Sequence, residues 1–136
     1  MKDGLTRKLP ASRAPGGSVE QFLSQYDVRL VAVSGPAAGS QHGLVGERLI
    51  VGRGPGVDAA FDDRSLSRQH AAIEFFEGGL RVRDLGSTNG VRLNGESVQS
   101  AELQHGDHIE IGTLTFQLVV ERQAVEQEVY ELPIEA

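Results

Sequence analysis

The sequence contains no cysteine among its 136 residues. Disulfide bonds, thiolate nucleophiles and zinc–sulfur sites are therefore excluded together. Apolar runs are also short, and none approaches the roughly 18 residues that a membrane-spanning helix needs. Because the N-terminus lacks the apolar core of a signal peptide as well, we expect a cytoplasmic protein with no membrane partner.

Basic residues are in deficit. Lys and Arg number 13 against 19 Asp and Glu, which gives a formal net charge of −6. General binding to nucleic acid depends on a surplus of Lys and Arg, so we expect no nucleic-acid partner. Any anion that this protein binds must be held locally by particular side chains.

The chain is long enough for one domain with extensions at both ends. Residues 1–26 have the composition of a flexible basic tail, and the capping-box spacing Ser18-Val19-Glu20-Gln21 predicts a short helix over residues 19–25. Residues 27–122 carry the regular apolar pattern of a folded domain. Residues 123–136 form an acidic C-terminal tail.

Apolar residues between residues 27 and 122 alternate or cluster in short blocks, as in Val28-x-Leu30-x-Ala32 and Ile109-x-Ile111. This period is typical of β-strands. Gly78-Gly79 and Asn94-Gly95 are predicted to be hairpin turns, because both residues of each pair can take a positive φ. The pattern predicts an all-β domain, either an antiparallel sandwich or a barrel, with weakly helical or flexible extensions.

Three polar segments interrupt this pattern at strand ends. They are Gly52-Arg53-Gly54, Ser67-Arg68-Gln69-His70 and Gly86-Ser87-Thr88-Asn89-Gly90. An arginine beside glycines, a serine before a second arginine and an amide-bearing turn indicate loops that gather at one end of a β-fold to hold an anion.

In this order the three segments resemble those of a forkhead-associated (FHA) domain. The similarity extends over roughly residues 28–121 and includes the segments 84–91 and 103–112. It implies an antiparallel β-sandwich that binds phosphothreonine peptides, with no enzymatic activity and no cofactor. Its partners would be phosphothreonine-containing proteins, namely a Ser/Thr kinase or the substrates of one.

The resemblance assigns phosphate binding to Arg53, Ser67 and Arg68. A planar guanidinium can pair with two phosphate oxygens, and a serine hydroxyl can donate to a third. Peptide binding is assigned to Thr88, as part of the wall around the phosphothreonine, and to Asn89, whose amide would pair with the peptide backbone. An alternative for Asn89 is a turn residue that only supplies a positive φ.

Gly52, His70 and Gly90 are expected to support the site, with His70 as a packed, hydrogen-bonded residue that shapes the phosphate loop. Arg64 and Ser65 lie where related domains select the residue three places after the phosphothreonine. Arg64 would favour Asp or Glu there, unless the adjacent Asp62 and Asp63 neutralise it.

Other functions remain open at this level. The domain could act in assembly without phosphate, or Ser67 and His70 could form a hydrolase with Asp84, although no nucleophile elbow surrounds them. A metal site at His105 and His108 beside Asp107 lacks a third clear ligand. Gly52-x-Gly54-x-Gly56 is not followed by the Gly-Lys-Ser/Thr of a nucleotide loop.

Thr6 is the only threonine of the N-terminal extension. If Thr6 were phosphorylated, the extension would be long enough to bring it to the loops of its own or a neighbouring molecule at high effective concentration. The sequence therefore allows self-binding through phosphorylated Thr6.

Overall fold

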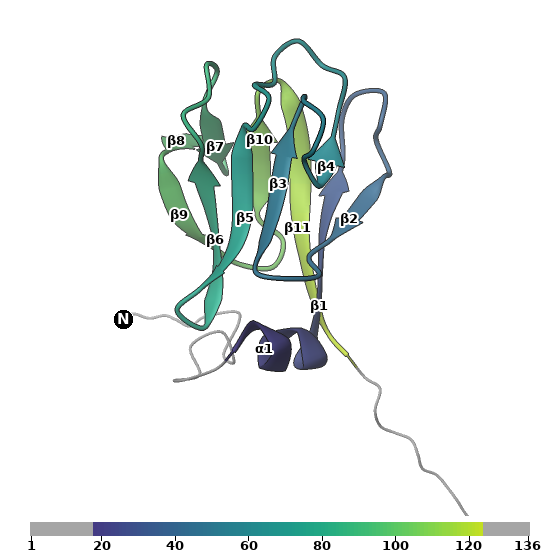
Figure 1. Ribbon diagram of the computed structural model, residues 1–136, viewed down its shortest axis with the longest axis vertical. Coiled ribbons are helices and arrows are strands. Elements are labelled where there is room, and N and C mark those ends of the chain that lie inside the picture. Colours follow the sequence, from purple (N-terminus) through teal and green to yellow (C-terminus); the bar gives the residue numbers. More distant parts are fainter. Residues whose placement is uncertain (1–17, 124–136) are drawn as a thin grey trace, which may run out of the picture.

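A computed structural model gives the structure of residues 18–123. Most of the predicted basic tail, Thr6 within it and the predicted acidic tail from residue 124 lie outside the described residues. The elements, in chain order, are α1 (Val19–Gln25), β1 (Tyr26–Ala32), β2 (Gln41–Gly43), β3 (Arg48–Gly52), β4 (Ala59–Ala60), β5 (Ala71–Phe76), β6 (Gly79–Asp84), β7 (Val91–Leu93), β8 (Glu96–Val98), β9 (Ser100–Leu103), β10 (His108–Ile111) and β11 (Leu114–Arg122) (Figure 1).

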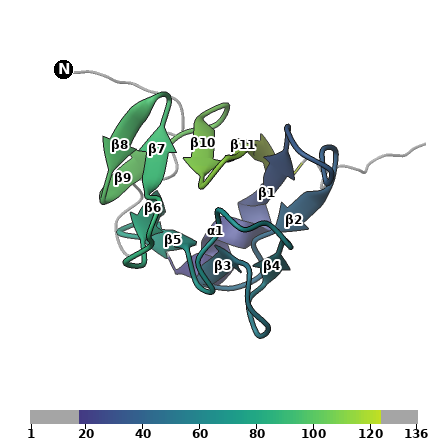
Figure 2. The ribbon, with the colours of Figure 1, turned by 90° about the horizontal axis from the view of Figure 1, so that it is seen from above.

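The strands form two sheets, which confirms the predicted β-sandwich. One sheet has the order β2-β1-β11-β10-β7-β8 and the other has the order β4-β3-β5-β6-β9. Seen from above, the two sheets curve around a common interior (Figure 2). Neighbouring strands are antiparallel except for the short β3–β4 pair, which is parallel.

Alternating residues of the strands build the core between the sheets. Buried and partly exposed residues alternate along β1 and along most of β11, as the period of a strand with one covered face requires. Ile73 and Val82 from one sheet and Ile109 and Phe116 from the other are fully buried. The sandwich is thus a rigid frame from whose ends the connecting loops project.

Helix α1 covers one end of the sandwich (Figure 1). The predicted capping box is present, because the Gln21 N–H donates to the Ser18 hydroxyl and the Ser18 N–H donates to the Gln21 side chain. A helix of seven residues is marginal alone. Packing of Phe22 against Tyr26 and Phe75, with ring centroids 5.0 and 5.4 Å apart, holds it in place.

The two predicted hairpin turns have different outcomes. Asn94 and Gly95 have φ of 50° and 92°, as predicted for the β7–β8 turn. In the β5–β6 turn the positive φ values belong to Glu77 and Gly78, at 51° and 81°. The prediction of Gly78-Gly79 is wrong by one residue, because Gly79 already pairs with Phe76 as the first residue of β6.

A cluster of charges lies on the outer face of the second sheet. The Glu74 carboxylate is nearly buried and receives Nε donors of Arg81 and Arg83, at 2.9 and 3.2 Å from its two oxygens, while Arg48 Nε lies 3.2 Å away. Hydrogen bonds from Arg83 and Arg81 lower the pKa of Glu74 to about 2. Glu74 therefore stays ionised at neutral pH and joins β3, β5 and β6.

We expect the Glu74→Gln protein to be less stable than the unchanged protein at pH 7. Because folding depresses the pKa of Glu74, its stabilising contribution is complete above the unfolded pKa near 4.5 and is lost as the pH falls towards 2. The difference in melting temperature between the two proteins should therefore shrink between about pH 4.5 and pH 2. Thermal unfolding followed by circular dichroism across this range would contradict the account if the difference stayed constant.

Candidate functional site

The three polar segments of the sequence meet at the end of the sandwich opposite α1 (Figure 1). They are the β3–β4 loop with Arg53, the β4–β5 loop with Ser67 and Arg68, and the β6–β7 loop with Thr88 and Asn89. Backbone hydrogen bonds join the first two loops, because the Arg53 N–H donates to Ser67 O at 3.0 Å and the Gly54 N–H to Arg68 O at 3.2 Å. The third loop joins them through the Thr88 N–H, which donates to Ser67 Oγ at 3.1 Å.

Gly52 makes this close approach of the loops sterically feasible. A Cβ atom on Gly52 would lie 2.0 Å from the Arg68 carbonyl oxygen and 2.7 Å from its carbonyl carbon. Any larger residue would have to push the β4–β5 loop away. The structure thus places Gly52 under the predicted phosphate-binding residues.

The guanidinium groups of the loops are available to a ligand. The Arg53 side chain is 46% exposed, and its Nε lies 3.7 Å from Oδ1 of Asp62, which is 98% exposed. Such a pair contributes little in water. Arg68 is exposed, and no carboxylate among residues 18–123 forms an ion pair with it.

Ser67 has an oriented hydroxyl. Its Oγ accepts the Thr88 N–H, which leaves the hydroxyl proton free to be donated elsewhere. The Oγ atom is therefore held against the β6–β7 loop, on the same residue whose carbonyl accepts the Arg53 N–H.

His70 is fully buried beneath these loops. Its Nδ1 accepts the Ser67 N–H at 3.1 Å, and its Nε2 lies 2.8 Å from Gly90 O. Since a carbonyl only accepts, the ring carries its proton on Nε2 and is neutral. It ties the serine loop to the β6–β7 loop.

This geometry does not provide a Ser67–His70 hydrolase. A catalytic base must contact the nucleophilic hydroxyl, whereas both ring nitrogens of His70 contact backbone groups. Asp84 accepts the Ser87 N–H instead of orienting the imidazole.

Asn89 is not the positive-φ residue of its turn. The β6–β7 loop has positive φ at Gly86 and Gly90, at 81° and 82°, so the alternative reading of Asn89 is wrong. The Asn89 Nδ2 group donates to Ser65 O at 2.8 Å. Its exposed Oδ1 makes no hydrogen bond to another described residue and is open to a donor from a ligand.

Ser65 holds two loops together. Its hydroxyl lies 2.6 Å from Asp63 Oδ1 and accepts the Thr113 N–H at 2.9 Å. Thr113 is 48 residues away, so no local pattern predicts its contact with Ser65, whereas the Asp63-x-Ser65 spacing is typical of an Asx turn. Arg64 is exposed and forms no ion pair within residues 18–123; Asp62 lies beside Arg53 instead.

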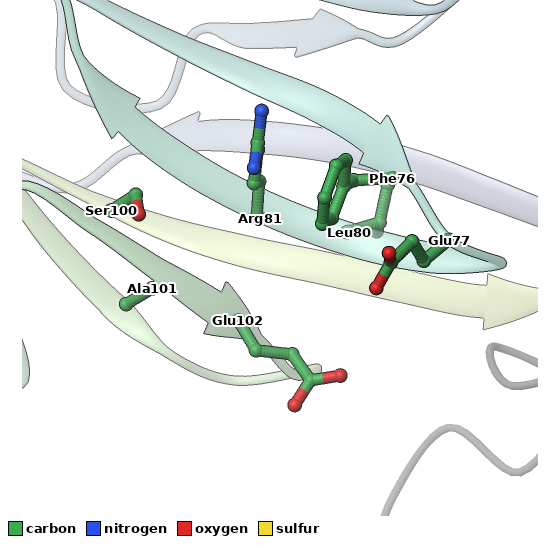
Figure 3. A pocket seen from close by; sticks show the side chains of 7 residues that line it. All are labelled: Phe76, Glu77, Leu80, Arg81, Ser100, Ala101 and Glu102. Atoms are coloured by element: carbon green, nitrogen blue, oxygen red, sulfur yellow. The ribbon is translucent and has the colours of Figure 1, made fainter.

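A hollow of about 310 Å³ lies elsewhere, between the β5–β6 turn and β9 (Figure 3). Its lining residues are Phe76, Glu77, Leu80, Arg81, Ser100, Ala101 and Glu102. The Arg81 guanidinium lies 3.7 Å above the Phe76 ring. No predicted site residue lines this hollow, so it is separate from the loops described above.

Two of the three residues considered for a metal site, His105 and Asp107, make structural hydrogen bonds. His105 Nδ1 accepts the Val120 N–H, and Asp107 accepts the Gln104 N–H. In the part of the chain that the structure describes, no three His, Asp or Glu residues are arranged to hold a metal ion. Within the same residues, no helix is long and apolar enough to span a membrane.

Comparison with known proteins gives consistent matches. The model of the FHA domain family matches residues 49–112. The glycogen accumulation regulator GarA of Mycolicibacterium smegmatis is 38% identical over 105 residues, which are 76% of this chain and 66% of GarA. An oxoglutarate dehydrogenase inhibitor of Corynebacterium efficiens is 38% identical over 110 residues, which are 81% of this chain and 78% of the inhibitor.

A solved structure of Mycobacterium tuberculosis EmbR in complex with a low-affinity phosphopeptide is also similar. Its TM-score is 0.64 at 28% identity, over 70% of this chain and 24% of EmbR. The family and the names of the two relatives point to a binding module rather than a catalyst.

Proposed function

This chain belongs to the FHA domain family, and we propose that it docks phosphothreonine-containing proteins in Ser/Thr kinase signalling. The observation that carries the proposal is the hydrogen-bonded contact of the Arg53 and Ser67 loops beside an exposed guanidinium. The names of GarA and the inhibitor support a regulatory role exerted through binding.

The phosphate is the part of the ligand that these loops suit best. A phosphothreonine carries a charge of about −1.5 to −2 at neutral pH and three strong acceptor oxygens. Arg53 would supply the fixed cation, the Ser67 hydroxyl a directed neutral donor, and Arg68 a second cation at the rim. In a protein with a net charge of −6, this local arrangement replaces a general basic surface.

The peptide on either side of the phosphothreonine would contact the β6–β7 loop. The Asn89 Oδ1 can accept a peptide N–H, and Thr88 would help to enclose the threonine methyl group. Discrimination by one methyl group amounts to about 1–3 kcal/mol, so we expect phosphothreonine to be preferred over phosphoserine without strict exclusion. Arg64 would favour an acidic residue three places after the phosphothreonine, whereas Ser65 would act by positioning the loop.

The partners we propose are a Ser/Thr protein kinase or its substrates in the cytoplasm. A second source of ligand is this chain itself, through phosphorylated Thr6. A phosphorylated peptide of residues 1–17 should displace a bound phosphothreonine peptide, and failure to displace it would remove self-binding from the proposal.

Calorimetric titration with matched peptides tests the central proposal. The panel contains one peptide as threonine, phosphothreonine and phosphoserine, and as phosphothreonine with Asp or Ala three places later. We expect binding only with phosphate, strongest for phosphothreonine with Asp. Equal binding of the unphosphorylated peptide would instead support a phosphate-independent assembly domain.

A further inference from the structure

A second pocket lies next to Arg53, where the β1–β2 loop, the β4–β5 loop and the first residue of β11 meet. Its volume is about 170 Å³, and it is lined by Pro36, Ala37, Phe61, Asp62, Asp63 and Leu114. Phe61 and Leu114 are nearly buried, and together with Pro36 and Ala37 they form the apolar part of the pocket lining. The volume suits one side chain rather than a larger ligand.

The two carboxylates give this apolar pocket a negative rim. Asp63 accepts the N–H and the hydroxyl of Ser65, at 2.9 and 2.6 Å, and these hydrogen bonds lower the pKa of Asp63. Asp63 is therefore charged at neutral pH. Asp62 is almost completely exposed, and Arg53 is its only ion-pair partner within residues 18–123.

Phosphate binding at Arg53 would change the surroundings of Asp62. Arg53 Nε lies 3.7 Å from Asp62 Oδ1. A phosphate that pairs with the Arg53 guanidinium competes with Asp62 for this cation. It also places a second negative charge near the Asp62 carboxylate. Two negative charges beside one guanidinium repel one another, so a cation from the ligand would be favourable at the rim.

We propose that this pocket receives a lysine or arginine side chain of the phosphothreonine ligand. The inference rests on the proposed function. The aliphatic stem of a basic side chain would cover Phe61 and Leu114, while its charged end would remain at the exposed Asp62 carboxylate. In the complex, Arg53 would pair with the phosphate and Asp62 with the basic side chain, in place of the Arg53–Asp62 pair of the free protein. The protein would thus recognise an anion and a cation that are a fixed distance apart in the ligand.

A purely apolar side chain is the competing occupant. It would fit the apolar part of the pocket lining but would leave Asp62 beside the phosphate without a counter-charge. The two occupants differ in one measurable property, because only the basic side chain depends on the charge of Asp62.

The test is a calorimetric scan with phosphothreonine peptides in which lysine replaces alanine at one flanking position at a time. We expect one position at which lysine strengthens binding about three- to tenfold, the effect of one partly exposed ion pair with some apolar burial. Norleucine at that position should give less than half of this gain. Asp62→Asn should remove the lysine gain and should strengthen binding of the alanine peptide, because a negative charge beside the phosphate is lost.

The control is Glu20→Gln, which makes the same change of charge on α1 at the opposite end of the sandwich. It should leave both affinities unchanged. The inference is overturned if norleucine equals lysine, if Asp62→Asn keeps the lysine gain, or if lysine has no effect at any position while phosphate-dependent binding is present. If no phosphothreonine peptide binds at all, the proposed function itself fails and this inference fails with it.

Discussion

Replacing Arg53 with alanine is expected to weaken phosphothreonine-peptide binding about ten- to 150-fold. This range corresponds to about 1.5–3 kcal/mol, the contribution of a hydrogen bond to a charged group. Arg53 is the cation on the loop that contacts Ser67, and neither Ser67 nor Thr88 can supply a positive charge in its place. The peptide without phosphate should bind equally weakly to both proteins.

The fold should survive this substitution. The two loops are joined by backbone hydrogen bonds, from the Arg53 N–H to Ser67 O and from the Gly54 N–H to Arg68 O, which alanine at residue 53 retains. The side chain is nearly half exposed, and its pair with Asp62 is long. We therefore expect the denaturation midpoint to change little.

Arg92→Ala provides the matched control. Arg92 is an exposed arginine of β7 whose nearest ionic partner, Glu110, is 3.9 Å away. The Arg92→Ala substitution removes one positive charge, as Arg53→Ala does, but leaves the three loops unchanged. Titration of both variants with the phosphorylated peptide would contradict the proposed site if the two lost affinity equally, because the effect would then follow net charge alone.

The sequence was sufficient for the features that depend on local chemistry. The capping box of α1 and the Asn94-Gly95 turn each need only a few adjacent residues, and both are present as predicted. The alternating apolar pattern predicts strands, but it does not distinguish a sandwich from a barrel. The resemblance of the three loop segments supplied that choice.

The features that the sequence did not predict depend on contacts between distant residues. The Ser65 hydroxyl bonds to Thr113, and Asn89 donates to Ser65 O from 24 residues away. The β5–β6 turn falls one residue early because cross-strand pairing of Phe76 with Gly79 fixes the register. The apolar pocket beside Asp62 likewise exists only where two loops meet the start of β11.

Gly52→Ala should have the second large effect, and it acts through the backbone rather than through charge. The new Cβ would lie 2.0 Å from the carbonyl oxygen of Arg68 and 3.0 Å from that of Ser67. Both are backbone atoms, so no side-chain rotation relieves the clash. The β4–β5 loop must move away from β3, which strains the hydrogen bonds from Arg53 N–H to Ser67 O and from His70 N–H to Val51 O.

We expect a loss of about 1–3 kcal/mol in the free energy of unfolding, the usual cost of overpacking a filled interior site. Phosphopeptide affinity should fall as well, although Arg53 and Ser67 are both retained. Movement of the β4–β5 loop changes the distance between these two residues, so one phosphate could no longer contact both in the same geometry. Denaturant titration measures the first effect, and calorimetry under conditions where the variant remains folded measures the second.

Gly46→Ala is the control, because a Cβ atom at Gly46 meets no atom within 4 Å and its φ lies outside the left-handed region. That variant should be neutral or slightly more stable, since alanine restricts the unfolded chain. If Gly52→Ala bound the phosphopeptide as tightly as Gly46→Ala, close contact of the two loops would not be needed for recognition. Arg53 would then bind the phosphate whatever the position of the Ser67 loop. That result would contradict a site in which the guanidinium and the serine hydroxyl bind one phosphate at a fixed distance from each other.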